Sequence, residues 1–336
     1  MSARSVLSAV FVAVLALTGA GLGAPAASAA PHSRAEHDRI VSFWTKDRVA
    51  KAIPRDFVRN RTTGRFTLTP TRGKPTKPGT GVTGTDWTGG GLVQKTTGKV
   101  LFAMSGTYYV CSASVVADTS TGTSLVLTAG HCVWDNEGSA FATNWMFIPD
   151  YDANPVALDT AGSFCAQTAY GCWTAQALTV PKAFADQTSF NTTATLHDFA
   201  FATVAAGGKS STQLDATVGT QNISYAQGST NATTDLFGYP AASPYDGKRL
   251  IYSEGALGFD PYNSNRTYRV ASTMTGGCSG GPWHQSFSAS TGAGTSMSVN
   301  SYSYSGLSYM HGPVFNSETR ALHDAADGAT SNSELG

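Results

Sequence analysis

Residues 100–116 of the sequence read VLFAMSGTYYVCSASVV, in which two β-prone runs are divided by the turn pair Ser105-Gly106. Similar short runs recur at Leu125–Thr128 and Phe199–Val204, and clusters of Gly, Ser and Thr separate them. Short β-prone runs between turn clusters indicate an all-β sandwich or barrel. We therefore expect an all-β body.

The strands of this body should be antiparallel. A parallel sheet would need a crossover helix of about ten or more residues between successive strands, and no segment with helical periodicity appears between Asp86 and Asn316. The single helical pattern is Ser317–Ala326, with Asn316 or Ser317 as its cap and Leu322 on its apolar side. We expect a C-terminal helix there.

The N-terminus has the layout of a cleaved secretory signal peptide. Arg4 precedes an apolar run from Val6 to Leu22, and Ala27-Ser28-Ala29 follows it. A membrane anchor is the alternative, but polar residues interrupt the run and a cleavage pattern follows at once. No later segment approaches the roughly eighteen apolar residues of a membrane span. We expect a signal peptide over residues 1–29, a secreted product and no membrane partner.

The formal net charge of zero hides two oppositely charged segments. Residues 31–85 include twelve basic and four acidic residues, whereas the chain from residue 86 onward has nine basic and eighteen acidic ones. A basic arm often binds nucleic acid, but this one directly follows a signal peptide and has few aromatic residues. We expect a propeptide and linker over residues 30–85 that docks on the acidic body, and no nucleic-acid partner. The stretch Thr71–Gly84 is typical of an exposed linker, with processing near residues 80–90.

Five cysteines in an exported chain predict two disulfides with one cysteine left over. Cys165 and Cys172 are close enough in sequence to close a short loop, and Cys111 and Cys132 flank a strand-turn-strand unit. These spacings favour the pairs Cys111–Cys132 and Cys165–Cys172, which leaves Cys278 outside both. Five cysteines also permit other pairings.

A glycine-rich turn presents one serine in Gly277-Cys278-Ser279-Gly280-Gly281. The glycines remove the side chains that would keep a substrate carbonyl away from the serine oxygen. Such a turn also directs main-chain N–H groups to one point, so Gly277 and Ser279 form a candidate oxyanion hole, with each donor worth about 3 kcal/mol. A plain glycine-rich loop is the alternative.

A nucleophilic serine needs a base, and the base needs a carboxylate that fixes its tautomer. The candidate base is His131, which lies in a small-residue turn after an apolar strand, although a histidine in such a turn can also be a packing residue. The candidate acid is Asp198, because an acid that opens an apolar strand can be buried against the base. Its neighbour His197 should point to the other face of the strand. The alternative acids are Asp186 and Asp215.

In their order along the chain, these features resemble the trypsin and chymotrypsin superfamily of serine peptidases. They are an upstream cysteine, Thr-Ala-Gly-His-Cys at 128–132, an aspartate before apolar residues, and Gly-x-Ser-Gly-Gly-Pro at 277–282. The resemblance implies a protease domain over residues 86–336, with the site in a cleft and Cys111–Cys132 holding the histidine loop. It implies two stacked antiparallel six-stranded β-barrels at about 90–205 and 220–316, followed by a helix at about 317–326.

Three segments resemble the bacterial branch that includes the glutamyl endopeptidases: Phe147-Ile148-Pro149, Phe237-Gly238-Tyr239-Pro240 and Met274-Thr275-Gly276-Gly277. The chain departs from the superfamily at Cys278, where trypsins have the aspartate that receives the new N-terminus on activation. Activation should therefore use another device, such as the propeptide. The glycine register makes Ser279, and not this thiol, the nucleophile. Relatives of the branch often have a second-barrel disulfide at positions that here read Ser253 and Ser272.

The resemblance also assigns a substrate pocket to residues before the nucleophile and to the strand that follows it. Trypsins have an acid at the position of Thr273, and glutamyl endopeptidases have a histidine at that of Asn300; both are missing here. The pocket should be neutral and polar, and its side-chain preference stays open. The candidate substrate-binding residues are Thr273, Met274, Asn300, Ser301, Tyr302 and Ser303.

Together these features predict a secreted monomeric serine endopeptidase that hydrolyses protein or peptide substrates through an acyl-enzyme on Ser279, with its own propeptide as a partner. A serine esterase of the α/β-hydrolase fold shares G-x-S-x-G, but it places the acid and histidine after the serine and needs strand-helix alternation. An inactive protease-like binding module is the other alternative. The seven histidines lack a ligand spacing such as H-x-x-x-H, so we expect no metal and no cofactor.

Overall fold

A computed structural model of the chain describes Met1 and residues 33–68, 82–154 and 164–336. The predicted signal peptide and most of the predicted linker lie outside the described residues. Within these ranges the chain is mostly β-strand with few helices, which confirms the predicted all-β fold class. Among the described helices, none is both long and apolar enough to cross a lipid bilayer.

Six antiparallel strands close into a barrel in the first half of the body. Their order is β6-β5-β10-β11-β12-β7, and β7 pairs back with β6. Ser105 and Gly106 have φ angles of 47° and 79°, the left-handed pair that a two-residue hairpin turn between β5 and β6 requires. The strands are β5 (Thr97–Met104), β6 (Thr107–Val116), β7 (Ser124–Thr128), β10 (Thr143–Pro149), β11 (Trp173–Pro181) and β12 (Ala200–Val204).

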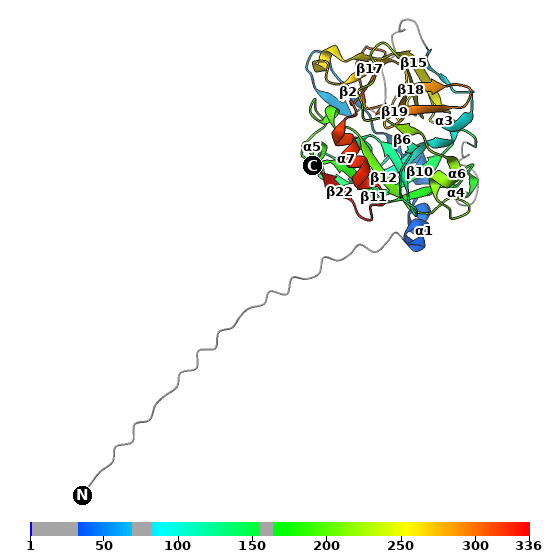
Figure 1. Ribbon diagram of the computed structural model, residues 1–336, viewed down its shortest axis with the longest axis vertical. Helices are drawn as coiled ribbons and strands as arrows, with labels where there is room; N and C mark the ends of the chain where they lie inside the picture. The colour runs from blue at the N-terminus through cyan, green and yellow to red at the C-terminus, as the bar shows by residue number, and fades with distance from the viewer. Residues whose placement is uncertain (2–32, 69–81, 155–163) are drawn as a thin grey trace.

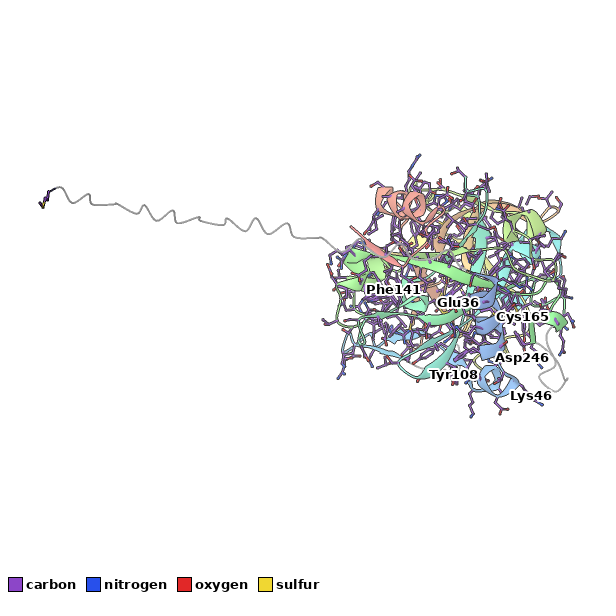
Figure 2. The ribbon with its side chains drawn as sticks, turned by 90° about the horizontal axis from the view of Figure 1, so that it is seen from below. Glu36, Lys46, Tyr108, Phe141, Cys165 and Asp246 are labelled. Carbon is purple, nitrogen blue, oxygen red and sulfur yellow. A yellow bond between two sulfur atoms is a disulfide. The ribbon has the colours of Figure 1, made fainter. Side chains whose placement is uncertain are left out.

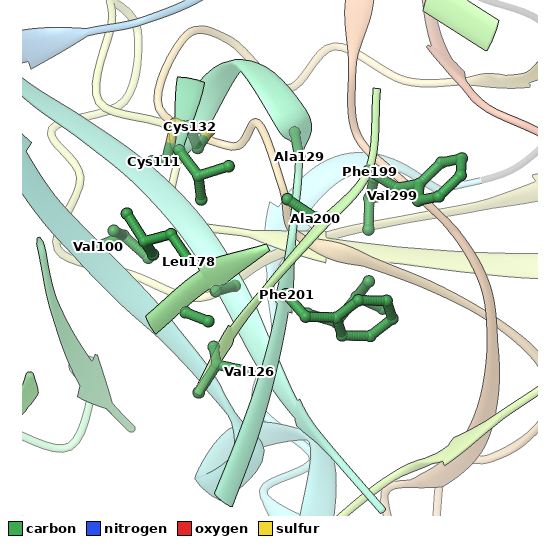
Figure 3. Packing of buried hydrophobic residues seen from close by; sticks show 14 of the residues in the cluster. Val100, Cys111, Val126, Ala129, Cys132, Leu178, Phe199, Ala200, Phe201 and Val299 are labelled. Atoms are coloured by element: carbon green, nitrogen blue, oxygen red, sulfur yellow. A yellow bond between two sulfur atoms is a disulfide. The ribbon is translucent and has the colours of Figure 1, made fainter. Parts of the chain in front are cut away.

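Large apolar side chains fill the interior of this barrel. Phe102, Phe147, Trp173 and Phe201 come from four of its strands, and all are fully buried. Burial of a large apolar side chain contributes about 1.5–3 kcal/mol. Figure 3 shows how the end of β7, at Ala129, lies beside β12 in this packing. The barrel therefore fixes the two strand ends that carry the predicted base and acid.

The second half of the body forms two six-stranded sheets. Figure 1 shows β15, β17, β18 and β19 stacked above the barrel strands β10, β11 and β12. One sheet has the order β13-β19-β18-β14-β15-β4 and the other β16-β17-β21-β20-β2-β3. Strands β2, β3 and β4 come from the N-terminal segment, so the start of the chain completes both sheets.

The bounds of these strands follow the chain. The first sheet contains β4 (Val82–Asp86), β13 (Asn222–Ile223), β14 (Thr233–Gly238), β15 (Ile251–Ala256), β18 (Pro282–Ser288) and β19 (Ala293–Val299). The second contains β2 (Phe57–Arg59), β3 (Phe66–Leu68), β16 (Gly258–Phe259), β17 (Tyr268–Ala271), β20 (Tyr302–Tyr304) and β21 (Tyr309–Gly312). Outside them, β8 (Trp134–Asp135) pairs with β9 (Ala140–Phe141), and β22 (Ser333–Leu335) pairs with β11.

The C-terminal helix α7 spans Ser317–Ala326, as the sequence predicts. Asn316 and Thr319 form a capping box in which each side chain binds the other residue's main chain, and Leu322 is buried. The prediction of a single helix in the body was incomplete, because the described part contains four short helices before it. With four to six residues each, they are too short to show helical periodicity. They are α3 (Gly91–Thr96), α4 (Phe164–Gln167), α5 (Lys182–Ala185) and α6 (Leu214–Val218).

The described part of the basic segment, residues 33–68, packs on the body. It contains α1 (Arg34–Phe43), α2 (Lys46–Lys51) and β1 (Ile53–Pro54). Trp44 is 2% exposed, packs edge-on against Tyr108 and donates its indole N–H to the main chain of β10 at 2.8 Å. Figure 2 shows the blue helices on the side of the body that carries Tyr108 and Cys165. Apolar burial thus adds to the charge attraction that the sequence indicates.

Candidate active site

The segment around Ser279 is a tight turn in which glycine is required for space. Gly277 and Gly280 have φ angles of 100° and 82°, which L side chains rarely adopt. A Cβ at Gly280 would stand 2.2 Å from Thr128 Oγ1 and 2.3 Å from the Ser112 carbonyl oxygen. The N–H of Ser112 donates to the carbonyl of Ser279 at 2.7 Å. Strands β6 and β7 of the barrel therefore fix the position of Ser279.

His131 and Asp198 form a buried pair at the ends of β7 and β12. Asp198 Oδ2 accepts a hydrogen bond from His131 Nδ1 at 2.8 Å, and Asp198 Oδ1 accepts one from the main-chain N–H of His131 at 2.8 Å. Neither side chain is exposed. The hydroxyl of Ser301 also donates to Asp198 Oδ2. Because the carboxylate binds Nδ1–H, Nε2 is the ring nitrogen available to accept a proton.

The alternative acids lie elsewhere. Asp186 forms an ion pair with the lysine one turn earlier in α5, and Asp215 accepts a hydrogen bond from a serine hydroxyl of β7 at 2.9 Å. His197 points away from Asp198, since its Nδ1 lies 2.7 Å from a carboxylate oxygen of Glu318 in α7. Of the three acids considered, Asp198 is the one in contact with His131.

Asp56, from the basic N-terminal segment, enters the site in a way that the sequence analysis did not predict. The N–H of Gly277 donates to Asp56 Oδ2 at 2.7 Å, and the hydroxyl of Ser279 donates to Asp56 Oδ1 at 3.0 Å. Among the described residues, His131 Nε2 has no hydrogen-bond partner. Ser279 is only 1% exposed. The Asp56 carboxylate therefore accepts the Gly277 N–H, one of the two candidate oxyanion-hole donors, and also the hydroxyl hydrogen bond that Ser279 would otherwise direct at the histidine.

The neighbours of Asp56 attach it to both sides of the site. Arg55 donates its Nε–H to the carbonyl of His131 at 2.9 Å and forms an ion pair with Asp135 at 3.1 Å. Phe57 stacks on Phe190, with ring centroids 4.0 Å apart, and meets the ring of His131 edge-on. In the sequence, Asp56 is marked only by its place between an arginine and an aromatic residue in a basic segment. This pattern does not by itself predict a contact with an active site.

Asn300, one of the substrate-pocket candidates, supports the nucleophile turn. Its amide nitrogen donates to the carbonyls of Phe237 and Cys278 at 2.9 and 3.0 Å, and its oxygen accepts from the Trp283 indole at 2.7 Å. The side chain is fully buried. The amide is thus used in holding the main chain next to Ser279.

The other pocket candidates lie in two separate parts of the second half. Tyr302 and Ser303 lie on β20, and the hydroxyl of Tyr302 donates to the buried Asp260 at 2.7 Å. Met274 is buried, and the hydroxyl of Thr273 contacts the Tyr245 hydroxyl at 3.2 Å and donates to the main chain of β4. The β4 strand therefore covers Thr273.

A buried carboxylate, that of Asp260, binds the tyrosine side chains of β20. Asp260 accepts hydrogen bonds from the hydroxyls of Tyr302 and Tyr304 at 2.7 and 2.8 Å. His311 stacks on Tyr302 with ring centroids 4.9 Å apart. Burial lowers the pKa of His311 to about 4, against the opposing charge of Asp260, so this histidine is neutral near pH 7. The cluster therefore contributes hydrogen bonds and stacking at β20 without a second protonated histidine.

Both expected disulfides, Cys111–Cys132 and Cys165–Cys172, are formed. The first ties the histidine turn to β6, and Figure 3 shows it to the left of Ala129. Potential ligand atoms of Cys111, His131 and Cys132 lie within 4.8 Å of one another. Because both sulfurs are bonded to each other, neither is a thiolate that could bind a metal.

The remaining cysteine and the two unusual serines are buried. Cys278 belongs to neither disulfide and is fully buried directly before Ser279. Ser253 and Ser272 donate and accept a hydrogen bond at 2.8 Å, and both are buried. The two serines thus lie side by side, at the pair of positions to which the resemblance assigns a second-barrel disulfide in many relatives.

The sequence matches no family model and no curated protein. Two solved structures are similar over most of the chain. The protease Anisep from Arthrobacter nicotinovorans is 34% identical, and the match covers 70% of this chain and 96% of Anisep with a TM-score of 0.58. The thermostable serine protease AL20 from an extremophilic microorganism is 33% identical, covering 71% of this chain and 99% of AL20, with a TM-score of 0.58. A Glu endopeptidase, 17% identical over 77% of this chain and 100% of its own, with a TM-score of 0.52, shares the fold.

Proposed function

We propose that this chain, which belongs to the trypsin and chymotrypsin superfamily of serine peptidases, is a secreted serine endopeptidase with Ser279, His131 and Asp198 as its catalytic residues. The observation that carries the proposal is the buried His131–Asp198 pair, whose turn is disulfide-bonded to the strand that binds the Ser279 carbonyl. Both similar proteins at 33–34% identity are described as proteases.

In the proposed reaction, Ser279 Oγ bonds to the carbonyl carbon of the substrate while His131 Nε2 takes the hydroxyl proton. The N–H groups of Gly277 and Ser279 hold the negative oxygen that forms. The C–N bond then breaks, and His131 gives its proton to the departing amine. Water attacks the acyl-enzyme in the same way and restores Ser279, while Asp198 stays ionised and stabilises the imidazolium.

The proposal includes synthesis as an inactive precursor. The basic segment before residue 86 would be its propeptide, and residues 1–29 its signal peptide. Support comes from the packing of residues 33–68 on the body, which brings Asp56 into contact with Ser279, and from the two disulfides, which suit an oxidising compartment. Protein or peptide substrates are the proposed partners, the chain acting as a monomer without a cofactor.

Covalent labelling with a fluorophosphonate tests the catalytic assignment. The processed protein should be labelled at Ser279, the Ser279→Ala variant should not, and the exposed Ser290→Ala variant should react as the parent does. Cleavage of a diverse peptide pool, read by mass spectrometry, should give products that disappear with Ser279→Ala. Labelling that persists in Ser279→Ala, or a processed protein that neither reacts nor cleaves, would contradict the proposal.

A further inference from the structure

We propose that the segment Ile53–Arg59 lies in the active-site cleft in the direction opposite to a substrate, and that the Asp56 carboxylate blocks the oxyanion hole. This inference rests on the proposed function, because it uses the catalytic roles given above. In this inference, one short segment inhibits the uncut precursor, and the carboxylate of Asp56 makes its main contact with the nucleophile turn.

The direction of the segment follows from its strand pairing. At its start, Ile53 and Pro54 of β1 pair in parallel with Tyr109 and Val110 of β6. At its end, Phe57–Arg59 of β2 pairs in parallel with Tyr302–Tyr304 of β20. Asp56 lies between these two pairings, at Ser279. The chain therefore passes from the first barrel, across the nucleophile, to the sheet of the second half.

The direction of a substrate follows from the proposed proton transfers. The departing amine must lie where His131 can protonate it, on the side of the histidine turn and of β6, which Cys111–Cys132 ties together. The acyl part then lies on the other side of Ser279, along β20 and the pocket candidates. Since the acyl part precedes the departing amine in sequence, a substrate runs from β20 to β6. The segment runs from β6 to β20.

A reversed chain presents a poor target to the nucleophile. In place of a peptide carbonyl, Ser279 meets a side-chain carboxylate that accepts a hydrogen bond from its hydroxyl at 3.0 Å, while the second carboxylate oxygen accepts one from the N–H of Gly277 at 2.7 Å. A carboxylate has the charge that an oxyanion hole binds, but it resists nucleophilic attack. The segment therefore imitates the charge of the reaction intermediate without being a bond that the enzyme can cut.

The segment is anchored on both sides of Asp56. Arg55 is 6% exposed and binds both Asp135 and the carbonyl of His131. Phe57 stacks on Phe190 and contacts the His131 ring edge-on. Gly276 makes the approach possible, because a Cβ there would stand 2.7 Å from Asp56 Oδ2 and 2.8 Å from the Cβ of Pro54. Three successive residues, an arginine, an acid and an aromatic residue, thus hold the segment in the site.

The test measures the rate at which a fluorophosphonate labels the uncut chain. A gel separates the full-length band from processed protein. Because reactivity scales with the fraction of open site, Asp56→Ala should raise the labelling rate at least about tenfold. Asp56→Asn keeps the shape of the side chain and removes its charge, so it should also raise the labelling rate. It provides the test if Asp56→Ala fails to fold. The control is Asp47→Asn, an exposed acid of the basic N-terminal segment outside residues 53–59, which should leave the rate unchanged.

Equal rates for the parent and both Asp56 variants, with no labelling of Ser279→Ala, would overturn the inference while leaving the proposed function intact. Absence of labelling in every variant and in processed protein would instead contradict the proposed function. The direction has its own test, by mass spectrometry of the parent and of Ser279→Ala during early processing. No Ser279-dependent cut is expected within residues 53–59, and such a cut between Asp56 and Phe57 would show that the segment binds as a substrate.

Discussion

Ser301 and Asp198, which lie 103 residues apart, share a hydrogen bond across the two halves of the molecule. Ser301 directly precedes β20 of the second half, whereas Asp198 lies at the start of β12 in the first barrel. The Asp198 oxygen that accepts this bond is also the one that binds His131 Nδ1. The orientation of the proposed base therefore depends on how the two halves pack, and not on the first barrel alone.

Asp198→Asn should lower kcat by about ten-thousandfold, as in the serine-peptidase template, because an amide next to Nδ1 favours the wrong tautomer of His131. Ser301→Ala removes one donor and keeps the carboxylate, so it should have a far smaller effect. Initial rates on a peptide identified from the pool experiment give both values. Hydrolysis by Asp198→Asn within about tenfold of the parent would show that another acid serves the base.

Arg55→Met should weaken docking of the proposed inhibitory segment, Ile53–Arg59, in the uncut chain. It removes the guanidinium that pairs with Asp135 and binds the His131 carbonyl, yet keeps most of the apolar stem. Truncating one partner of a buried charge pair costs about 2 kcal/mol or more, so the labelling rate of the uncut chain should rise about thirtyfold. Arg65→Met, at an exposed arginine outside residues 53–59, is the control. If the labelling rate rises equally in both variants, the loss of a positive charge from the N-terminal segment, and not the loss of this contact, weakens the docking.

Much of the fold and of the site could be predicted because the signals are local. The strands β5 and β6 follow from two β-prone runs around a left-handed turn, and Ser279 follows from glycines that only a sharp turn requires. The role of Asp56 could not be predicted, because it arises from docking between residues 223 positions apart. Asn300 shows a second limit. Its position near the nucleophile could be inferred from the sequence, but the direction of its amide depends on the carbonyls and the indole that surround it.

Asp235 should make the stability of the chain depend on pH. Burial, with a smaller effect from the charge of Glu254 opposite it on β15, raises its pKa from 3.8 to about 7. Its other cross-strand neighbour, His284, has a pKa lowered to about 3 by burial and supplies no positive charge. A pKa raised by folding means that the folded chain holds this proton more tightly, so stability is full below about pH 4 and decreases as the pH rises to about 7.

Asp235→Asn imitates the protonated acid and should therefore stabilise the chain at pH 8, with a benefit that fades toward pH 5. We expect Tm to rise by at least about 2–4 °C at pH 8, which corresponds to a gain of about 1 kcal/mol in the free energy of unfolding for a domain of this size. Thermal unfolding is best followed in a Ser279→Ala background, which prevents self-cleavage. Glu137→Gln, at an exposed acid, should show no such pH-dependent gain. If the variant is no more stable than its parent at pH 8, folding does not raise the pKa of Asp235 as expected.

Replacing Ser253 and Ser272 together by cysteine should create a stabilising disulfide. The two buried hydroxyl oxygens lie 2.8 Å apart on chain segments 19 positions apart. Closing a loop of that length stabilises a fold by about 3 kcal/mol, which corresponds to a rise in Tm of about 6–12 °C. Thiol counting on the unfolded protein should detect only Cys278, whereas Ser253→Cys alone should add one reactive thiol and no stability. If the double variant keeps both new thiols, or gains no Tm when they pair, the two positions lack the spacing of a disulfide despite their hydrogen bond.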